Sequence, residues 1–310
     1  MSVLTQPRFH DEAAAYEWVE SRLWPAGPVC PHCKGTERIS KMQGKSTRLG
    51  AYKCYVCRKP FTVKVGTIFE SSHLPMHLWL QAIFLLCSSK KGISSNQLSR
   101  TLGITIKSAW FLSHRVREAM REGDLAPMGG AGGVGGIVEA DETYYGAKDT
   151  ITTRTKHGKP GHASKRVIVS LVERGGPVRS FHVERATKTA ITDIVTGNVA
   201  REASLYTDES KLYDNAPRYV IDHQTVVHSA GEYVRGIVHT NSVEGFFGIF
   251  KRGMRGVYQH CSEKHLHRYL SEYDFRYNHR IRRGVDDVTR AEKALRGVAG
   301  KRLTYRTTAG

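Results

Sequence analysis

The chain has 310 residues, enough for one to three domains, and its 40% apolar and 25% charged residues exclude a disordered or fibrous protein. Lysine and arginine number 47 against 29 acidic residues, so the net charge of +18 indicates an anionic partner, most simply nucleic acid. No apolar run reaches the roughly 20 residues that cross a bilayer, and acidic residues stand where a signal peptide would be apolar. These features predict a cytoplasmic protein with no membrane partner.

The first predicted domain, residues 1–70, combines an N-terminal helix with two Cys-x-x-Cys pairs. The pairs are Cys30 with Cys33 and Cys54 with Cys57. Their spacing is typical of four-thiolate zinc sites, in which two tight turns aim four sulfurs at one ion. Because four thiolates leave no position for water, we expect one structural zinc ion per chain. The alternatives are that His32 replaces one cysteine ligand, or that the pairs are only buried or redox-active.

Residues 71–125 have apolar positions at three- and four-residue spacing, which predicts helices. Within this segment Gly103 permits a sharp turn between two helical stretches, and the second stretch opens with polar side chains. The layout is typical of a helix-turn-helix, whose second helix enters the major groove of DNA. Lys107 and Arg115 are the predicted DNA contacts in this segment. A plain three-helix bundle is the alternative.

A flexible linker is predicted at residues 126–136, which contain six glycines in eleven positions. Residues 137–290 form the next predicted domain, with three strands, a helix, a strand, a short irregular piece, a strand and a long helical region. This alternation favours a mixed α/β sheet with helices on its faces, so the predicted fold class is multidomain α/β. Residues 291–310 are predicted to be a basic tail.

Three places in the α/β domain set a carboxylate at the edge of regular structure. Asp141 lies in the first predicted strand, Asp208 follows a later strand, and Glu244 begins the long helix. Such carboxylates can converge over one edge of a sheet, where they would hold the two Mg²⁺ ions that phosphodiester chemistry uses. Each strand acid has an acidic neighbour, Glu142 or Glu209, and strand alternation does not decide between the members of either pair.

The third acid has two interpretations from spacing. Lys251 follows Glu244 by seven residues, almost two helical turns, so both project from one face and Lys251 would contact a substrate phosphate. Asn241 precedes Glu244 by three residues, the spacing of a capping box in which Glu244 merely binds the Asn241 amide. Spacing alone supports the catalytic and the capping roles equally.

Several motifs occur in a fixed order along roughly residues 15–285. They are CPHCKG, YKCYVCRKPFTVKVGTIFE, VEADETYYG, LYTDES and VHTNSVEGFFGIFKRG. Together they resemble bacterial insertion-sequence transposases of the ISXO type, which join a zinc ribbon to a DDE-type catalytic domain. The resemblance implies an RNase H-like fold for the catalytic domain. It also implies Mg²⁺-dependent cleavage and transfer of DNA strands at the terminal inverted repeats of the element, with Mn²⁺ as a substitute metal.

The resemblance also implies roles for particular residues. The first catalytic acid falls on Asp141, the second on Asp208, and the third on the HTNSVEGFF segment. Relatives carry Glu or Asn as the third catalytic residue, followed by a Lys. Glu244 is favoured here because it has the family's spacing to Lys251 and because a carboxylate neutralises metal charge better than an amide does. Asn241 is the other candidate, and otherwise it caps the helix.

The C-terminal part of the chain is strongly basic, with 15 lysines and arginines against 6 acidic residues between positions 245 and 310. Such a density of charge attracts DNA phosphates regardless of base sequence. The predicted contacts are Arg252, Arg255, Arg276 and Arg280. The partners implied are double-stranded DNA, as element ends and target, and further copies of the chain in a homo-oligomer on DNA, associated with the nucleoid. The alternatives to a transposase are a catalytically degenerate DNA-binding regulator and an RNase H-like nuclease.

Overall fold

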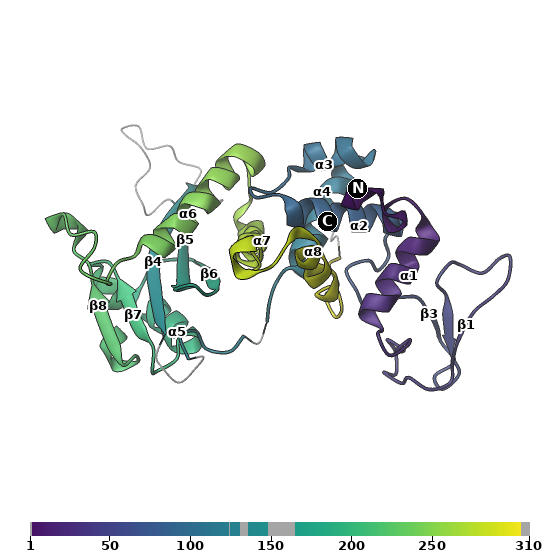
Figure 1. Cartoon of the computed structure of the whole chain (residues 1–310), viewed down its shortest axis with the longest axis horizontal. Coiled ribbons are helices and arrows are strands. Elements are labelled where there is room, and N and C mark those ends of the chain that lie inside the picture. The colour runs from purple at the N-terminus through teal and green to yellow at the C-terminus, as the bar shows by residue number, and fades with distance from the viewer. Residues whose placement is uncertain (1, 124, 131–135, 148–164, 305–310) are drawn as a thin grey trace, which may run out of the picture. The chain divides into compact units, whose positions relative to one another are not determined.

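A computed structural model describes residues 2–123, 125–130, 136–147 and 165–304 (Figure 1). The chain divides into two compact units. One unit comprises Met1–Glu122 together with His279–Gly310, and the other comprises Gly123–Asn278. The first unit is therefore built from both ends of the chain, and the second is inserted between them.

The first unit begins with helix α1 (Glu12–Leu23) and a three-stranded antiparallel sheet. The strands, in the order in which they pair, are β1 (Ile39–Lys41), β2 (Tyr52–Cys54) and β3 (Pro60–Phe61). Three aromatic rings pack together beside this sheet, with Trp24 edge-on to both Tyr52 and Phe61. They adjoin the buried cysteines of the two Cys-x-x-Cys pairs. The core of this ribbon is therefore small, and a metal ion would add substantially to its stability.

The rest of the first unit is mainly helical. Its longer helices are α2 (Met76–Ser88), α3 (Ser95–Leu102), α4 (Ile106–Ala119) and α8 (Asp287–Arg296). α3 begins where the Ser94 hydroxyl accepts the N–H of Gln97, and it ends at Gly103, whose φ of 64° lies in the left-handed region that favours glycine. The Thr105 hydroxyl then caps α4. The two helices and the turn at Gly103 lie where the sequence predicts them, and the helix-turn-helix role stays a prediction.

The C-terminal boundary differs from the prediction. The second unit ends at Asn278 rather than at residue 290, and part of the predicted basic tail belongs to helix α8. α8 packs on α2, where the guanidinium of Arg290 is buried and donates to the carbonyl oxygen of Cys87 at 2.9 Å. These contacts, which join segments about 200 residues apart, attach the helix to the first unit. Residues 305–310 of the predicted tail lie outside the described residues.

The second unit is built on a five-stranded mixed sheet in the order β6-β5-β4-β7-β8. The strands are β4 (Ile137–Ala147), β5 (Lys165–Glu173), β6 (Val178–Val183), β7 (Ser204–Thr207) and β8 (Asp222–Thr225). β4 pairs antiparallel with β5 and parallel with β7, and β8 runs parallel to β7. Counted within the unit, the strand order is 3-2-1-4-5 with an antiparallel second strand. This is the predicted RNase H-like arrangement.

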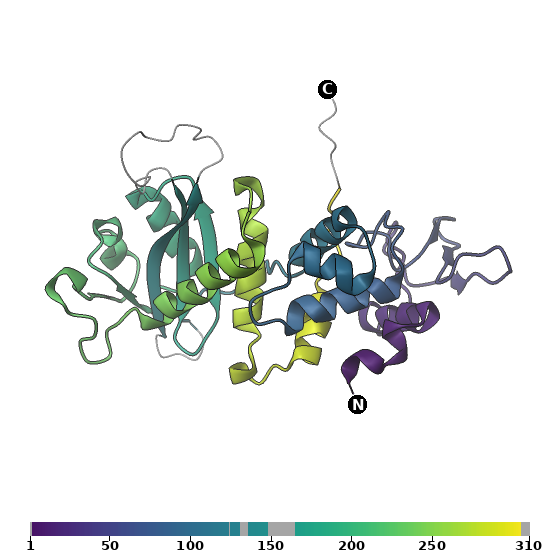
Figure 2. The ribbon, with the colours of Figure 1, turned by 90° about the horizontal axis from the view of Figure 1, so that it is seen from above.

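Helices cover both faces of this sheet (Figures 1 and 2). α5 (Lys188–Asn198) packs on one face, whereas α6 (Asn241–Gly253) and α7 (Leu266–Asn278) pack on the other. The apolar stripe predicted for α6 is buried against the sheet and consists of Val243, Phe246, Phe247 and Phe250. A π-helical turn, Met254–Tyr258, directly follows α6.

The predicted linker at residues 126–136 is packed at both of its described ends. Met128 is 1% exposed, and its backbone bonds to the segment that ends α5. Gly129 has a φ of 78°, and a Cβ added there would lie 2.6 Å from the Cβ of Ala203. Glycine at this position therefore allows close approach of two backbones rather than flexibility. Residues 131–135 lie outside the described residues.

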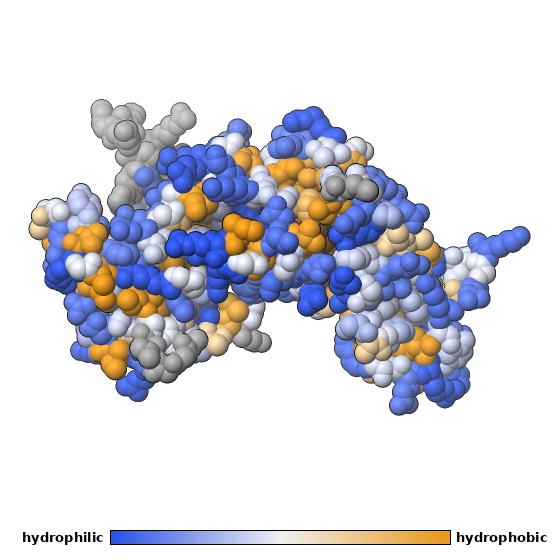
Figure 3. Space-filling view, in the orientation of Figure 1, coloured by the Kyte–Doolittle hydropathy of each residue, from blue (hydrophilic) through white to orange (hydrophobic). Residues whose placement is uncertain are grey.

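The viewed surface is mainly hydrophilic, with small hydrophobic patches (Figure 3). Among the residues that the structure describes, no helix combines the length and the apolar character needed to span a membrane.

Candidate active site and zinc centre

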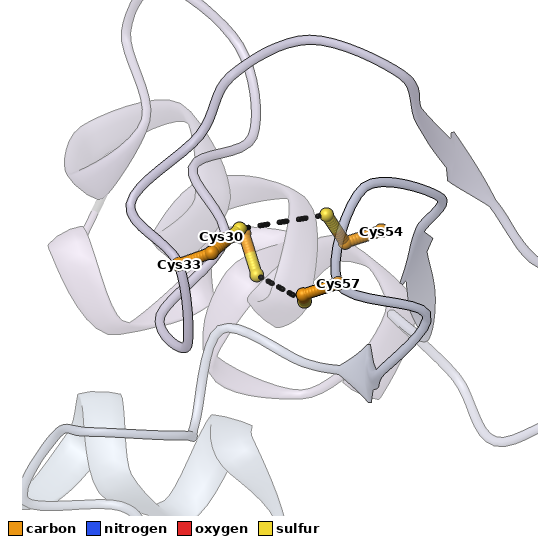
Figure 4. Close-up of side chains that lie close together, drawn as sticks. All are labelled: Cys30, Cys33, Cys54 and Cys57. Atoms are coloured by element: carbon orange, nitrogen blue, oxygen red, sulfur yellow. Dashed lines mark hydrogen bonds between the residues drawn. The ribbon is translucent and has the colours of Figure 1, made fainter.

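Four cysteine sulfurs converge in the first unit (Figure 4). The Sγ atoms of Cys30, Cys33, Cys54 and Cys57 all lie within 4.8 Å of one another. Cys30 Sγ is 3.6 Å from Cys57 Sγ, and Cys33 Sγ is 3.7 Å from Cys54 Sγ. Sulfurs bound tetrahedrally at about 2.3 Å from Zn²⁺ are about 3.8 Å apart. The four predicted ligands therefore form one cluster whose dimensions fit zinc.

The first cysteine of each pair is prepared to act as a thiolate. Burial acts to raise the pKa of Cys30, but backbone N–H groups of Cys33 and His32 outweigh it and lower that pKa to about 7. The backbone N–H of Cys57 likewise lowers the pKa of Cys54. Because zinc binds the thiolate form, these turns favour metal binding. His32 is exposed and does not belong to the sulfur cluster.

Two acids meet beyond the paired ends of the parallel strands β4 and β7. The last paired residues are Glu139 and Tyr206, so Asp141 and Asp208 stand opposite each other two positions further along. Neighbouring strands lie about 4.8 Å apart, which makes these two carboxylates close neighbours. Both side chains are half-buried.

Asp141 is the electrostatic centre of this group. Burial raises the pKa of its carboxyl, and the carboxylates of Asp208, Glu142 and Glu244 raise it further, to about 8. Burial also raises the pKa of Asp208. Ionisation of such a cluster near neutral pH is favoured by a bound cation, and carboxylate oxygens are the ligands that Mg²⁺ prefers. These residue types therefore suit a divalent metal ion, whereas among the described residues the ligand atoms that lie together at metal-binding distance are those of the four cysteines.

Helix α6 brings the third acid and the lysine to the same place. Glu244 and Lys251 each follow a residue of the buried stripe by one position, so both stand on one flank of the helix. The Glu244 side chain is 48% exposed, and its Oε1 lies 3.6 Å from Nε2 of His228. Burial lowers the pKa of Lys251, and the charge of Asp141 opposes that change. Asp208, Glu244 and Lys251 thus each interact electrostatically with Asp141.

The acidic neighbours of the two strand acids have other partners. Glu142 points to the α5 side of the sheet, where it accepts hydrogen bonds from Ser210 Oγ at 3.1 Å and from the Tyr213 hydroxyl at 3.0 Å. Glu209 is exposed and accepts the backbone N–H groups of His228 and Ser229. Glu209 therefore binds the backbone of the loop that follows β8 and does not join the acidic cluster.

The predicted cap at the start of α6 is wrong. Thr240, not Asn241, is the N-cap residue, because Asn241 already occupies the first helical position. The Thr240 hydroxyl donates to Oε1 of Glu244 at 2.8 Å, so Glu244 does not bind the Asn241 amide as a capping box requires.

A carboxylate that the sequence analysis missed binds the first turn of α6. Glu139 accepts the backbone N–H groups of Ser242 and Val243 at 2.7 and 3.2 Å. The sequence does contain a signal for it, since Glu139 precedes Asp141 by two residues in a strand and must share its face of the sheet.

The predicted DNA contacts differ in their accessibility. Lys107 is exposed at the second position of α4, while Arg252 and Arg255 are exposed at the end of α6 and in the π-helical turn. Arg280 is half-buried and precedes a short 3-10 helix of the first unit. Lys107, Arg252 and Arg255 are therefore the solvent-exposed members of the predicted set.

Two of the predicted DNA contacts are wrong because the side chains are internal. Arg115 is 4% exposed, and its guanidinium donates to the carbonyl oxygens of Ile68 and Glu70 at 2.7 and 2.8 Å. Arg276 is 8% exposed and pairs with Glu272 at 2.5 Å. Both cations satisfy buried acceptors, so their role is structural.

Comparison with known protein families identifies both parts of the chain. Residues 133–278 match the family of ISXO2-like transposase domains, and residues 10–60 match the transposase zinc-ribbon domain. The chain carries an ISXO2-like transposase domain. Its function is that of a DNA transposase, an enzyme of the polynucleotidyl-transferase type, and DNA is its partner.

Similarity to individual proteins extends over most of this transposase. The chain is 26% identical over 283 residues to a Halobacterium salinarum protein described as an uncharacterized protein in transposable element ISH50, covering 86% of this chain and 91% of the relative. It also matches the crystal structure of a pre-cleavage Mos1 transpososome at 10% identity, covering 64% of this chain and 75% of that chain. The TM-score of that match is 0.18, too low to indicate a shared fold.

Proposed function

We propose that this transposase cleaves DNA at the terminal inverted repeats of its insertion sequence and joins the ends to target DNA in a reaction that depends on Mg²⁺. The observation that carries this proposal is that the β4–β7 register sets Asp141 opposite Asp208, while Glu244 and Lys251 stand on one flank of α6. These carboxylates would hold two Mg²⁺ ions, which supply activation of an attacking hydroxyl and stabilisation of the leaving oxygen.

Each residue of the site has a proposed role that follows from its position in the fold. Asp141 in the middle of β4 and Asp208 directly after β7 would bind metal, and Glu244 would complete the ligand set from its exposed position on α6. Lys251 binds a substrate phosphate from the same flank of α6, where its charge offsets the anionic groups around it. Glu142 supports the site through its bonds to Ser210 and the Tyr213 hydroxyl.

Glu244 rather than Asn241 is the proposed third catalytic residue. Its carboxylate contributes to the raised pKa of Asp141, which supports close approach of the two groups. It also accepts a hydrogen bond from the buried Thr240 hydroxyl, which fixes its orientation. A carboxylate neutralises more metal charge than an amide does.

DNA binding is assigned to both units. The zinc ribbon, with one structural Zn²⁺ per chain, and the helix-turn-helix with exposed Lys107 would recognise duplex DNA of the element ends. Arg252 and Arg255, with the half-buried Arg280, would bind backbone phosphates. Joining two ends in one reaction requires a homo-oligomer on DNA, and the site of action is the cytoplasmic nucleoid.

The test is a strand-joining assay with labelled element-end duplexes, a target duplex and Mg²⁺ or Mn²⁺. Asp141→Ala and Asp208→Ala should each lower joining by at least about a hundredfold, because each removes a metal ligand, while affinity for the end duplex changes little. Retained joining by either variant would show that these acids are not the ligands. Hydrolysis of the end without joining in the wild type would favour a nuclease instead.

The third position has its own pair of variants. Glu244→Gln should abolish joining, whereas Asn241→Ala, about one helical turn earlier and also exposed, should leave most of it. The reverse pattern would assign the third metal ligand to Asn241.

A further inference from the structure

Glu139 is a fully buried carboxylate on β4 whose oxygens are all occupied by protein donors. It is 0% exposed. Its Oε1 accepts from Nε of Arg174 at 2.8 Å and from the Ser242 hydroxyl at 2.9 Å. Its Oε2 accepts the N–H groups of Ser242 and Val243 at 2.7 and 3.2 Å. Because nothing of this carboxylate faces solvent, it contacts neither metal nor DNA, and its role must act through its neighbours.

The contacts make Glu139 the cap of helix α6, supplied from the sheet. The N-cap residue of a helix usually accepts the N–H groups of the second or third helical residue with its own side chain. Thr240 occupies the N-cap position, but its hydroxyl is directed to Glu244. Glu139 takes over the capping role, and its negative charge complements the positive end of the helix dipole.

Arg174 extends the same network to the loop that leads into α6. Its guanidinium donates to the carbonyl oxygens of Ile237 and His239 at 2.6 and 3.1 Å. It also lies over the Tyr206 ring, 5.1 Å from the centroid. The Glu139–Arg174 pair is thus satisfied on both sides, which is the condition under which a buried ion pair holds a defined geometry.

The position of this network relates it to the catalytic acids. Glu139 and Asp141 share one face of β4, and Ser242 and Val243 immediately precede Glu244 in α6. One side chain therefore connects the strand that carries the first acid to the helical turn that carries the third. Metal sites need their ligands held to within about 0.5 Å.

We propose that Glu139 is a positioning residue, which fixes Glu244 relative to Asp141 by capping α6 from the sheet. This inference rests on the proposed function, in which Asp141 and Glu244 share a metal site. Asp208 directly follows β7, the strand that pairs with β4, so its position does not depend on the cap of α6.

The test compares two identical substitutions of buried glutamates in the full chain. Glu139→Gln keeps the shape but replaces one acceptor oxygen with an NH₂ group that cannot accept the N–H groups of α6. Glu272→Gln is the matched control, because Glu272 is also 0% exposed and paired with an arginine, but it lies in α7. The readouts are the rise in Tm on titration with Mn²⁺ and the Mn²⁺ concentration that gives half-maximal strand joining.

We expect Glu139→Gln to need about 10- to 100-fold more Mn²⁺ in both measurements, as changes to residues that orient metal ligands do. Glu272→Gln should lower the metal-free Tm without changing the Mn²⁺ requirement. Ser242→Ala removes only the 2.9 Å hydroxyl bond to Glu139 and should shift the requirement in the same direction by about threefold.

A wild-type Mn²⁺ requirement in folded Glu139→Gln would overturn the proposal. If that variant does not fold, Ser242→Ala decides, and an unchanged requirement there overturns the proposal as well. Failure of the proposed function gives a different result, in which the wild type and Asp141→Ala respond equally to Mn²⁺ and neither joins DNA.

Discussion

Asp141 is placed where its charged form is destabilised, because it is half-buried and interacts with three other carboxylates. Without metal, this arrangement lowers the free energy of unfolding, and a bound cation would offset that loss. Asp141→Asn keeps the shape and removes the charge, so we expect it to raise the metal-free free energy of unfolding at pH 8 by about 1–2 kcal/mol while abolishing strand joining. Thermal or urea unfolding with and without Mg²⁺ checks this. A loss of metal-free stability in the variant would contradict the account of the site.

The raised pKa of Asp141 also predicts how stability varies with pH. The folded protein holds this proton up to about pH 8, whereas the carboxyl ordinarily loses it near 3.8. Between these values the folded state binds more protons, so the contribution of Asp141 to stability is complete below the ordinary pKa and is lost as pH rises through 8. We expect the metal-free Tm to fall from pH 5 to pH 8, and to fall less in Asp141→Asn or with Mg²⁺ present. An equal fall of the metal-free Tm between pH 5 and pH 8 in the wild type and in Asp141→Asn would contradict this prediction.

Thr240 offers a test of orientation with little effect on packing. Its side chain is 1% exposed and donates to Glu244 Oε1 at 2.8 Å. Thr240→Val removes the donor at nearly constant volume, so we expect strand joining to fall about tenfold. Thr240→Ser retains the hydroxyl and should keep near wild-type joining, although it loses a buried methyl group. Equal activity of the two variants would show that the hydroxyl does not orient Glu244.

At the scale of elements, the zinc ribbon is the part of the fold that depends most on a cofactor. Its apolar core is small, so metal removal should unfold it. We expect about one zinc per chain, lost in Cys54→Ser, with increased protease cleavage between residues 24 and 66. Cys87→Ala is the control, because Cys87 is equally buried but lies in α2, outside the sulfur cluster. Zinc retained by Cys54→Ser would refute the assigned ligand set.

The elements that the sequence predicted correctly are those set by local pattern. The stripe of α6 follows from apolar spacing, and the turn before α4 follows from Gly103. The cap of α6 could not be predicted in the same way, because Glu139 and Ser242 are 103 residues apart. Arg115 was misassigned for the same reason, since its acceptors Ile68 and Glu70 come from a distant loop. A cation in a helix has no local signal that distinguishes a DNA contact from an internal one.

The two pairs of neighbouring acids, Asp141 with Glu142 and Asp208 with Glu209, also depend on contacts that are distant in the sequence. Sequence alternation left Asp141 and Glu142 equivalent, and the pairing of β4 with β7 is what sets Asp141 opposite Asp208. Glu142, the next residue along β4, points to the opposite face of the sheet, where it accepts a hydrogen bond from the Tyr213 hydroxyl. The sequence therefore predicts which segments carry acidic residues, but the face of the sheet to which each acidic side chain points depends on the register of the strands.

At the scale of the whole molecule, the net charge of +18 predicts DNA binding that falls steeply with salt. The structure refines which cations contribute, because Arg115 and Arg276 are bound to internal acceptors while Arg252 and Arg255 are exposed. Total charge thus overstates the number of phosphate contacts.

The salt dependence of binding separates these two groups of arginines. Each cation that neutralises a phosphate contributes about 0.9 to the slope of log affinity against log salt. The double variant Arg252→Gln with Arg255→Gln should therefore reduce the magnitude of the slope by about 2, measured by fluorescence anisotropy of a labelled duplex over a range of NaCl concentrations. Arg115→Gln should leave the slope unchanged and lower the Tm instead, because it leaves buried carbonyl oxygens without a donor. An unchanged slope in the double variant would remove α6 and the turn after it from the DNA interface and leave Lys107 and the first unit as its remaining candidates.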